Sequence, residues 1–188
     1  MTILDTARTR LEPFKEKDEH ELLSVFRDPG VRKYLLDDQL VDLDWVRLEI
    51  ETSQQRFDES GAGLWAIRLI DQLQSPDQTQ STDRTQIVGF VGYREFFDPP
   101  QLQLIYGLLP AIWGQGLATE VSRECCHHGF KNLGFKSIRA AIDTPHEASR
   151  RVLESLGFVE TSSDPSFELG TTFFELPQTD WDQQNQDR

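Results

Sequence analysis

The chain has 188 residues, of which 37% are hydrophobic and 10% aromatic, and this length and composition are typical of one folded domain with its own core. Its 19 basic and 32 acidic residues give a formal net charge of −13, and because such a surface repels phosphate backbones, we expect no nucleic acid as a partner. No apolar run approaches the roughly 18 residues of a membrane-spanning helix, residues 1–5 show no secretory leader, and the adjacent Cys125 and Cys126 cannot join distant segments, so we expect a cytoplasmic protein that binds no membrane.

The first half of the chain predicts two helices enclosed by strands. Residues 8–14 alternate polar and apolar side chains, which predicts a strand. Asp18 and Glu21 have the spacing of a capping box and begin a helix that ends at residues 28–30. A second helix runs from about Asp44 to the glycines at 61 and 63, and strands follow at 64–70 and 87–93. Residues 71–86 between these strands are almost all polar, and we expect a flexible hairpin loop there.

The second half alternates strands and helices. It predicts a strand over 102–109, a helix over 116–133 and a strand over 137–142. Thr144 is the predicted cap of a further helix, which ends at Gly157, and a last strand covers 171–176. Residues 178–188 form a polar C-terminal tail that we expect to fray.

This order of elements favours a single α+β domain over residues 8–177. Three consecutive strands favour antiparallel pairing, whereas the strand–helix–strand unit from 102 to 142 favours a parallel crossover. We therefore predict a mixed, mostly antiparallel sheet flanked by helices.

The most informative segment is residues 110–120 (PAIWGQGLATE), between the end of a strand and the first turn of a helix. Gly114, Gly116 and Ala118 let a ligand approach the backbone, and the unpaired amides of a helix N-terminus attract a phosphate. A tight turn with small residues for packing is the alternative. The segment also begins a dinucleotide fingerprint, but Thr119 stands where the third glycine or alanine belongs.

The chain resembles the GNAT superfamily of acetyl-CoA-dependent N-acetyltransferases, most of all its RimJ/RimL-type branch. The resemblance lies in residues 9–14 (TRLEPF), 28–35 (DPGVRKYL), 106–120 (YGLLPAIWGQGLATE) and 148–158 (ASRRVLESLGF). It implies a GNAT-like splayed sheet, acetyl-CoA as co-substrate and no metal. It places the cofactor against Leu108, the loop and helix start, and the second motif: Trp113, Gly114, Gln115, Gly116, Leu117, Ala118, Thr119, His146 and Ser149.

The resemblance also implies direct transfer of the acetyl group, without a covalent enzyme intermediate. Ser149 matches a motif serine that could bind the cofactor sulfur or arm, and Tyr106 lines the cleft or packs in the core. The family's usual glutamate base near the start of the fourth strand is replaced by Leu102 and Gln103, so we take Glu95 as the candidate base. Three further family residues differ here, at Trp113, His146 and Leu153.

Two other clusters have simpler interpretations. Residues 125–128 (CCHH) cannot converge on one metal ion, because neighbouring helical side chains point about 100° apart, so we expect core packing and no metal. Acidic residues on the presumed acceptor side either attract a protonated amine or form a solvated face: Asp37, Asp38, Asp42, Asp44, Glu49 and Glu51.

The predicted function is acetyl transfer to a primary amine, either a protein N-terminus or a small molecule. As partners we expect a small-molecule or peptide amine, in a monomer or a homodimer. The alternatives are a non-catalytic CoA-binding regulatory module, which the missing glutamate favours, and a dinucleotide-dependent oxidoreductase.

Overall fold

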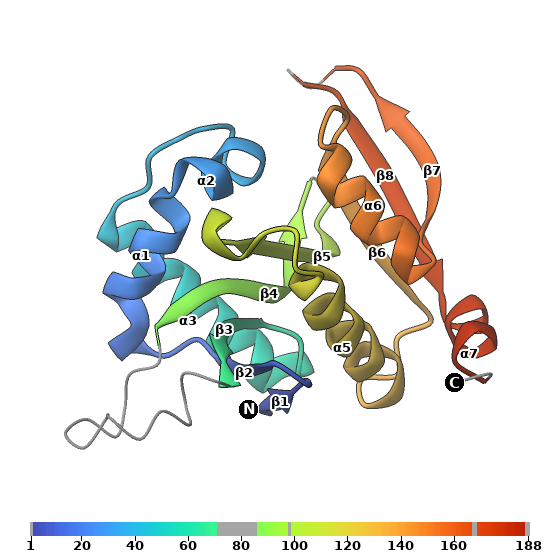
Figure 1. Cartoon of the computed structure of the whole chain (residues 1–188), viewed down its shortest axis with the longest axis horizontal. Coiled ribbons are helices and arrows are strands. Elements are labelled where there is room, and N and C mark those ends of the chain that lie inside the picture. Colours follow the sequence, from blue (N-terminus) through green and yellow to red (C-terminus); the bar gives the residue numbers. More distant parts are fainter. Residues whose placement is uncertain (1, 71–85, 98, 167–168, 187–188) are drawn as a thin grey trace.

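The computed structural model describes residues 2–70, 86–97, 99–166 and 169–186 (Figure 1). One eight-stranded sheet runs through it in the order β1-β2-β3-β4-β5-β6-β8-β7. Its strands are β1 (Leu4–Asp5), β2 (Thr9–Pro13), β3 (Leu64–Leu69), β4 (Ile87–Phe96), β5 (Gln101–Leu108), β6 (Ser137–Asp143), β7 (Val159–Asp164) and β8 (Thr171–Pro177). The helices are α1 (Glu19–Arg27), α2 (Pro29–Leu35), α3 (Leu43–Ser60), α5 (Leu117–Lys131), α6 (Glu147–Leu156) and α7 (Gln178–Gln186), with 3-10 turns η1 (Glu16–Asp18) and η2 (Pro110–Ile112). The predicted α+β domain with a mixed sheet flanked by helices is confirmed.

The sheet is splayed at its centre. Neighbouring strands pair antiparallel except β5 and β6, which run parallel as the strand–helix–strand unit predicts. These two strands meet at a single residue pair, Gln103 opposite Arg139, and diverge toward their carboxyl ends (Figure 1). Within the described residues, the second half of β5 therefore has β4 on one side and no paired strand on the other.

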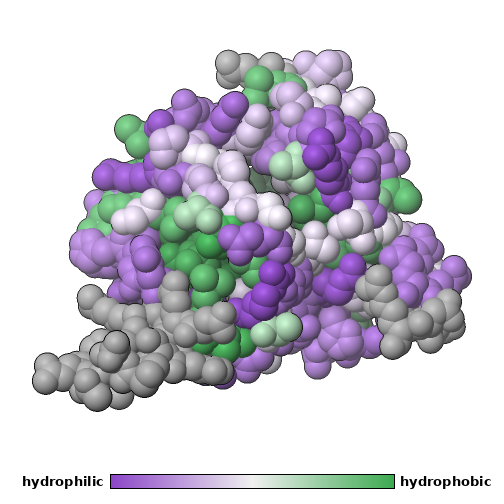
Figure 2. Space-filling model, in the orientation of Figure 1, coloured by the Kyte–Doolittle hydropathy of each residue, from purple (hydrophilic) through white to green (hydrophobic). Residues whose placement is uncertain are grey.

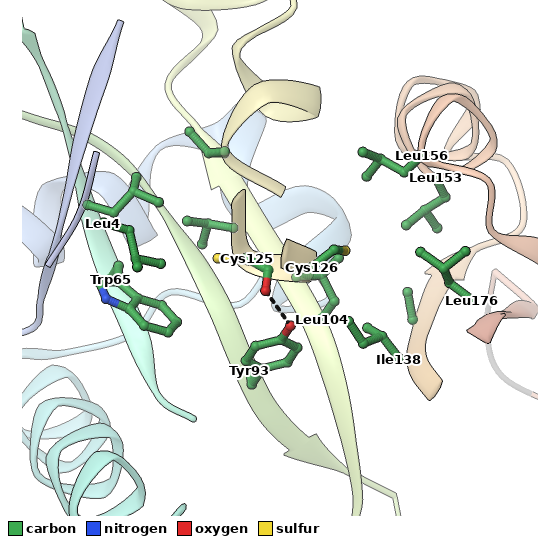
Figure 3. Packing of buried hydrophobic residues seen from close by; sticks show 14 of the residues in the cluster. Leu4, Trp65, Tyr93, Leu104, Cys125, Cys126, Ile138, Leu153, Leu156 and Leu176 are labelled. Atoms are coloured by element: carbon green, nitrogen blue, oxygen red, sulfur yellow. Dashed lines mark hydrogen bonds between the residues drawn. The ribbon is translucent and has the colours of Figure 1, made fainter. Parts of the chain in front are cut away.

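Two apolar cores cover the opposite faces of the sheet. One packs α5, α6 and α7 against the face that carries Leu104 and Ile138. Figure 3 shows its centre, where the Tyr93 hydroxyl donates to the backbone oxygen of Cys125 at 2.8 Å. The other packs α1, α2 and α3 against the face that carries Ile105. Because strand side chains alternate, even-numbered residues of β5 face α5 and odd-numbered ones face α1–α3.

Both predicted helix caps are wrong, because distant residues take the side chains. The carboxylate of Asp18 binds the guanidinium of Arg68 at 2.8 Å and makes no capping bond to α1. Glu21, its predicted capping-box partner, instead accepts a hydrogen bond from the first residue of β4 at 2.9 Å. The α6 helix begins at residue 147, and its cap is His146 rather than Thr144.

The structure adds three elements that the sequence analysis misses: β1, α2 and β7. Residues 28–30 end α1 as predicted, but they also begin α2, since Asp28 accepts a bond from the amide of Gly30 at 2.8 Å and Pro29 occupies the first turn. The side chains of β7 are almost all exposed, so they carry no alternation of apolar residues.

The expectation of a fraying tail after residue 178 is wrong for most of that segment. Residues 178–186 form α7, and Trp181 of this helix is only 2% exposed. Its ring packs against Phe130 of α5, with 5.6 Å between ring centroids. The predicted flexible loop at 71–86 lies outside the described residues, apart from Gln86.

Candidate functional site

The loop between β5 and α5 presents open backbone at a helix N-terminus. Gly114 and Gly116 have φ angles of +72° and +74°, a left-handed conformation that favours glycine. Gly116 is the N-cap of α5 and makes no side-chain capping bond. A methyl group at Gly114 would meet no atom of the described chain within 4 Å, and one at Gly116 would meet only Nη2 of Arg8, at 3.9 Å. The backbone amides and the open space therefore fit a phosphate group, and the fit extends to a diphosphate.

An arginine stands beside this loop, although the sequence analysis assigns the loop no cationic side chain. Arg8 Nη1 donates to the backbone oxygen of Gln115 at 2.9 Å, and Arg8 Nε donates to the carboxylate of Glu120 at 2.7 Å. Glu120 lies in the first turn of α5 and also accepts from the Thr6 hydroxyl at 2.6 Å. Burial alone would raise the pKa of Glu120, but the hydrogen bonds from Thr6 and Arg8 lower it overall. These contacts fasten β2 to the loop across 107 positions of sequence.

Trp113 ties the same loop to β5 and to α2. Its indole Nε1 donates to the backbone oxygen of Leu108 at 2.6 Å. A methyl group at Gly30 of α2 would lie 2.8 Å from the indole ring, so the ring packs directly on the helix backbone. The side chain is nevertheless 53% exposed. Trp113 thus joins the phosphate-binding loop to the α2 side of the splay.

The free edge of β5 points its backbone into the splay. Leu109 donates its amide to Val88 of β4 at 2.9 Å, and hydrogen-bonding direction alternates along an antiparallel strand. The backbone groups of Tyr106 and Leu108 therefore face away from β4, toward β6. In Figure 2 the surface dips between the α2 side and the α6 side of this face. An extended ligand could pair with this edge as a strand does.

Tyr106 crosses the splay from β5 to α6. Its hydroxyl donates to the backbone oxygen of Ser149 at 3.2 Å. Burial raises the pKa of Tyr106, so the phenol stays protonated at neutral pH. The structure thus brings together two residues that the sequence analysis names separately.

His146 closes the top of the splay. Its Nδ1 accepts a hydrogen bond from the amide of Ser149 at 3.4 Å, and its ring lies 3.9 Å from the ring of Tyr34 of α2, centroid to centroid. Burial, with a smaller contribution from nearby Lys33, lowers the pKa of His146 to about 4. The ring is therefore neutral at pH 7, as its role as hydrogen-bond acceptor requires.

Asp143, at the carboxyl end of β6, is a candidate that the sequence analysis misses. Its odd-numbered position places it on the α1–α3 face, because Ile138 and Ala140 face α5. Its Oδ2 atom is buried and has no hydrogen-bond partner among the described residues. Burial and then the nearby carboxylate of Asp37 raise the pKa of Asp143. No sequence motif marks this residue, since the approach of the 36–42 loop is a tertiary event.

The structure does not bring Glu95 to this site. Glu95 lies near the end of β4, opposite Leu102 at the start of β5, which is the end of β5 farther from the loop. Its carboxylate pairs with Arg56 of α3 at 2.7 Å. Thr119, by contrast, lies at the α5–α6 contact, with its hydroxyl 3.4 Å from that of Ser155.

The acidic residues of the acceptor side mostly have structural partners. Asp42 caps α3 through the amide of Trp45 at 2.9 Å. Three others form ion pairs: Asp38 with Arg32 at 3.2 Å, Asp44 with Arg47 at 3.2 Å and Glu49 with Arg94 at 3.1 Å. Burial raises the pKa of Glu49 despite its pairing with Arg94.

The CCHH cluster packs in the interior. Cys125 and Cys126 are fully buried, and burial raises the pKa of both thiols. The ring of His128 packs edge-on against Trp65 at 5.6 Å. Within the described part of the chain, no three His, Cys, Asp or Glu side chains gather as a metal-binding group. The described helices include none with the length and apolar character needed to cross a membrane.

Comparison with known proteins agrees with this geometry. The family model described as "Acetyltransferase (GNAT) domain" matches residues 8–159, most of the chain. The uncharacterized N-acetyltransferase YoaA of Bacillus subtilis is 24% identical over 157 residues, which cover 83% of this chain and 82% of YoaA. A putative GNAT-family acetyltransferase from Bordetella pertussis superposes with a TM-score of 0.74 at 19% identity, over 93% of this chain and 99% of that one.

A third similar structure is a complex with coenzyme A. It is RimL, the ribosomal L7/L12 alpha-N-protein acetyltransferase, with a TM-score of 0.73 and 12% identity over 94% of this chain and 98% of that one. At this identity the likeness concerns the fold. The extent of the family match, together with the splayed sheet and the glycine-rich helix start, shows that this chain belongs to the GNAT family of acetyltransferases.

Proposed function

We propose that this protein transfers an acetyl group from acetyl-CoA to the primary amine of a peptide N-terminus or a small molecule. The observation that carries the proposal is the open cradle at Gly114 and Gly116, which lies at the N-terminus of α5 and next to the free edge of β5. Amides of the cradle would hold the diphosphate, and the backbone of Tyr106 and Leu108 would pair with the pantetheine arm. The RimJ/RimL-type resemblance favours a peptide N-terminus as the acceptor.

When bound, acetyl-CoA supplies an acetyl thioester as the electrophile. The attacking amine must be neutral, so a basic group has to accept its proton. We assign this role to Asp143, because it faces the acceptor side, keeps one oxygen without a protein partner, and has a raised pKa that brings its basicity closer to neutrality. A carboxylate with one free oxygen can take the proton directly or through a water molecule.

Two protonated or neutral groups support the same site. The amides of Tyr106 and Leu108 point into the splay and can stabilise the negative charge that develops on the carbonyl oxygen. The protonated phenol of Tyr106 holds the first turn of α6, and with it Ser149, against β5. Ser149 is the candidate to hydrogen-bond the departing sulfur, as the sequence motif predicts.

The alternative is a CoA-binding module without catalysis. It is favoured by the neutral Gln103 in place of the family's usual glutamate and by the engagement of Glu95 with Arg56. Both functions predict binding of CoA, but only the enzyme releases CoA thiol when an amine is present.

The test combines calorimetry with a thiol-release assay. Acetyl-CoA is titrated into the protein, with NAD as the control for the dinucleotide interpretation, and thiol release is then measured with peptides of different N-termini and with small amines. Both protein cysteines are buried, so they contribute little background to a thiol reagent. Binding with amine-dependent release supports the enzyme, and binding without release from any acceptor supports the module. If acetyl-CoA does not bind, both proposals are wrong.

A further inference from the structure

The side chain of Gln103 is a buried amide without a partner. The residue is 2% exposed, and neither Oε1 nor Nε2 has a hydrogen-bond partner among the described residues. Unsatisfied buried polar atoms are few in native proteins, and each asks for an explanation such as a missing water or ligand. Here both hydrogen-bonding atoms of one side chain are unsatisfied, in the strand that borders the splay.

The position of Gln103 connects it with the acceptor side of the site. It forms the single pair between β5 and β6, at the point from which the two strands diverge. Its odd-numbered position directs the side chain to the α1–α3 face, as with Ile105 and with Gly107, whose missing methyl group would meet Val31 of α2. The amide therefore lies at the base of the splay, on the face that Asp143 shares.

The two polar neighbours of Gln103 on this face bind other residues. Arg94, opposite on β4, pairs with Glu49 at 3.1 Å. Arg139, opposite on β6, donates to Gln101 at 3.3 Å and lies 3.8 Å from Glu175. Neither guanidinium is recorded as a hydrogen-bond partner of the amide, although both stand next to it in register. The side chain of Arg94 is 26% exposed, so its displacement would open a route from solvent toward Gln103.

We propose that Gln103 recognises the acceptor and selects an amine whose neighbouring carbon bears a carbonyl group, as in a peptide N-terminus or an amino acid amide. This inference rests on the proposed acetyl transfer. A carboxamide presents one acceptor and one donor side by side in a plane, so its best partner presents a donor and an acceptor equally close together. Oε1 accepts from the amine, and Nε2 donates to the carbonyl oxygen.

The surrounding charge narrows the class to neutral carbonyl groups. Asp143 and Asp37 face the same side, and the chain carries a net charge of −13, so a free carboxylate next to the amine would be repelled. Because a carboxamide cannot take up the proton of the amine, Gln103 is a recognition residue, and deprotonation remains with Asp143.

The test compares two acceptors of similar shape, alaninamide and isopropylamine, at equal concentrations of free base. The variants are Gln103→Met, which keeps the length but removes both polar atoms, and the control Gln101→Met on the same strand. We expect wild type to favour alaninamide at least tenfold in kcat/KM. Gln103→Met should lower kcat/KM for alaninamide at least tenfold and change that for isopropylamine less than threefold, whereas Gln101→Met should leave the ratio unchanged.

Stability separates recognition from a structural role. Because Gln103→Met removes an unpaired buried amide, its melting temperature should equal or exceed that of wild type; a marked fall would show that the amide is structural and overturn the inference. Gln103→Glu, which keeps the shape but loses the donor, should reduce the same acceptor ratio and serves if the methionine variant does not fold.

The two proposals fail in different ways. Equal use of both acceptors by wild type, or equal loss of both in Gln103→Met, overturns the recognition role while acetyl transfer stands. Absence of transfer to any amine overturns the proposed function. Calorimetry of alaninamide against CoA-saturated protein then decides about Gln103 by itself, since weaker binding to Gln103→Met supports the recognition role and unchanged binding overturns it.

Discussion

Replacing Gly116 by alanine isolates the contribution of the cradle to cofactor binding. Its φ of +74° costs a non-glycine residue about 1–2 kcal/mol, whatever space surrounds it. For a domain of this size, each kcal/mol lowers the melting temperature by about 2–4 °C, so we expect a fall of about 2–8 °C. The added methyl group meets nothing in the chain closer than 3.9 Å, so any further effect concerns a ligand.

Gly134 provides a matched control for this strain. Its φ is +71°, and a methyl group there would meet no described atom within 4 Å, but it lies beyond the other end of α5. Gly134→Ala should therefore lose similar stability and keep its affinity for CoA. Gly116→Ala should raise the Kd for CoA at least tenfold, which is about 1.4 kcal/mol. Gly116→Glu, which adds a negative charge beside the diphosphate, should abolish binding.

The assay is calorimetry with CoA, together with melting curves with and without CoA, since a ligand that binds only the folded state raises the melting temperature in proportion to its affinity. Equal CoA affinity in folded Gly116→Ala and Gly134→Ala would refute the cradle. Loss of affinity in both variants would show that backbone strain, rather than contact with the ligand, controls binding.

Three further predictions concern charged and titrating groups. Asp143→Asn should lower kcat at least tenfold and remove the acidic limb of its pH profile while leaving the Kd for CoA unchanged; wild-type kinetics would exclude Asp143 as the base. His146 has a folded pKa of about 4, below its unfolded value of about 6.5, so its contribution to stability is present above pH 6.5 and lost as pH falls toward 4. His146→Asn keeps a cap acceptor for Ser149 and should show a shallower fall in melting temperature over this window, and an identical fall would contradict the assignment. Asp18→Ala leaves Arg68 buried with only more distant carboxylates, so we expect a loss of about 3 kcal/mol in urea denaturation, and a loss below about 1 kcal/mol would show that the pair contributes little.

Local patterns in the sequence determined most of the elements and the cofactor-binding half of the site. Hydrophobic periodicity and helix stops are properties of short segments, so α3, α5 and the long strands could be predicted from them. The cradle could be predicted for the same reason, because Gly114 and Gly116 act through their own backbone conformation at the start of the following helix. The parallel pairing of β5 and β6 also follows from the order of elements.

Only the tertiary structure decided how distant charges pair and which polar groups remain free. Asp18 has the sequence of a helix cap, but Arg68, 50 positions later, takes its carboxylate. Glu95 was a candidate base until Arg56 of α3 proved to bind it. Asp143 gained its raised pKa from burial and from a loop about a hundred positions earlier in the chain. The polar tail, too, became a helix because a single tryptophan, Trp181, found a place in the core. Ion pairing and burial depend on distances in space, and a one-dimensional pattern carries no record of those distances.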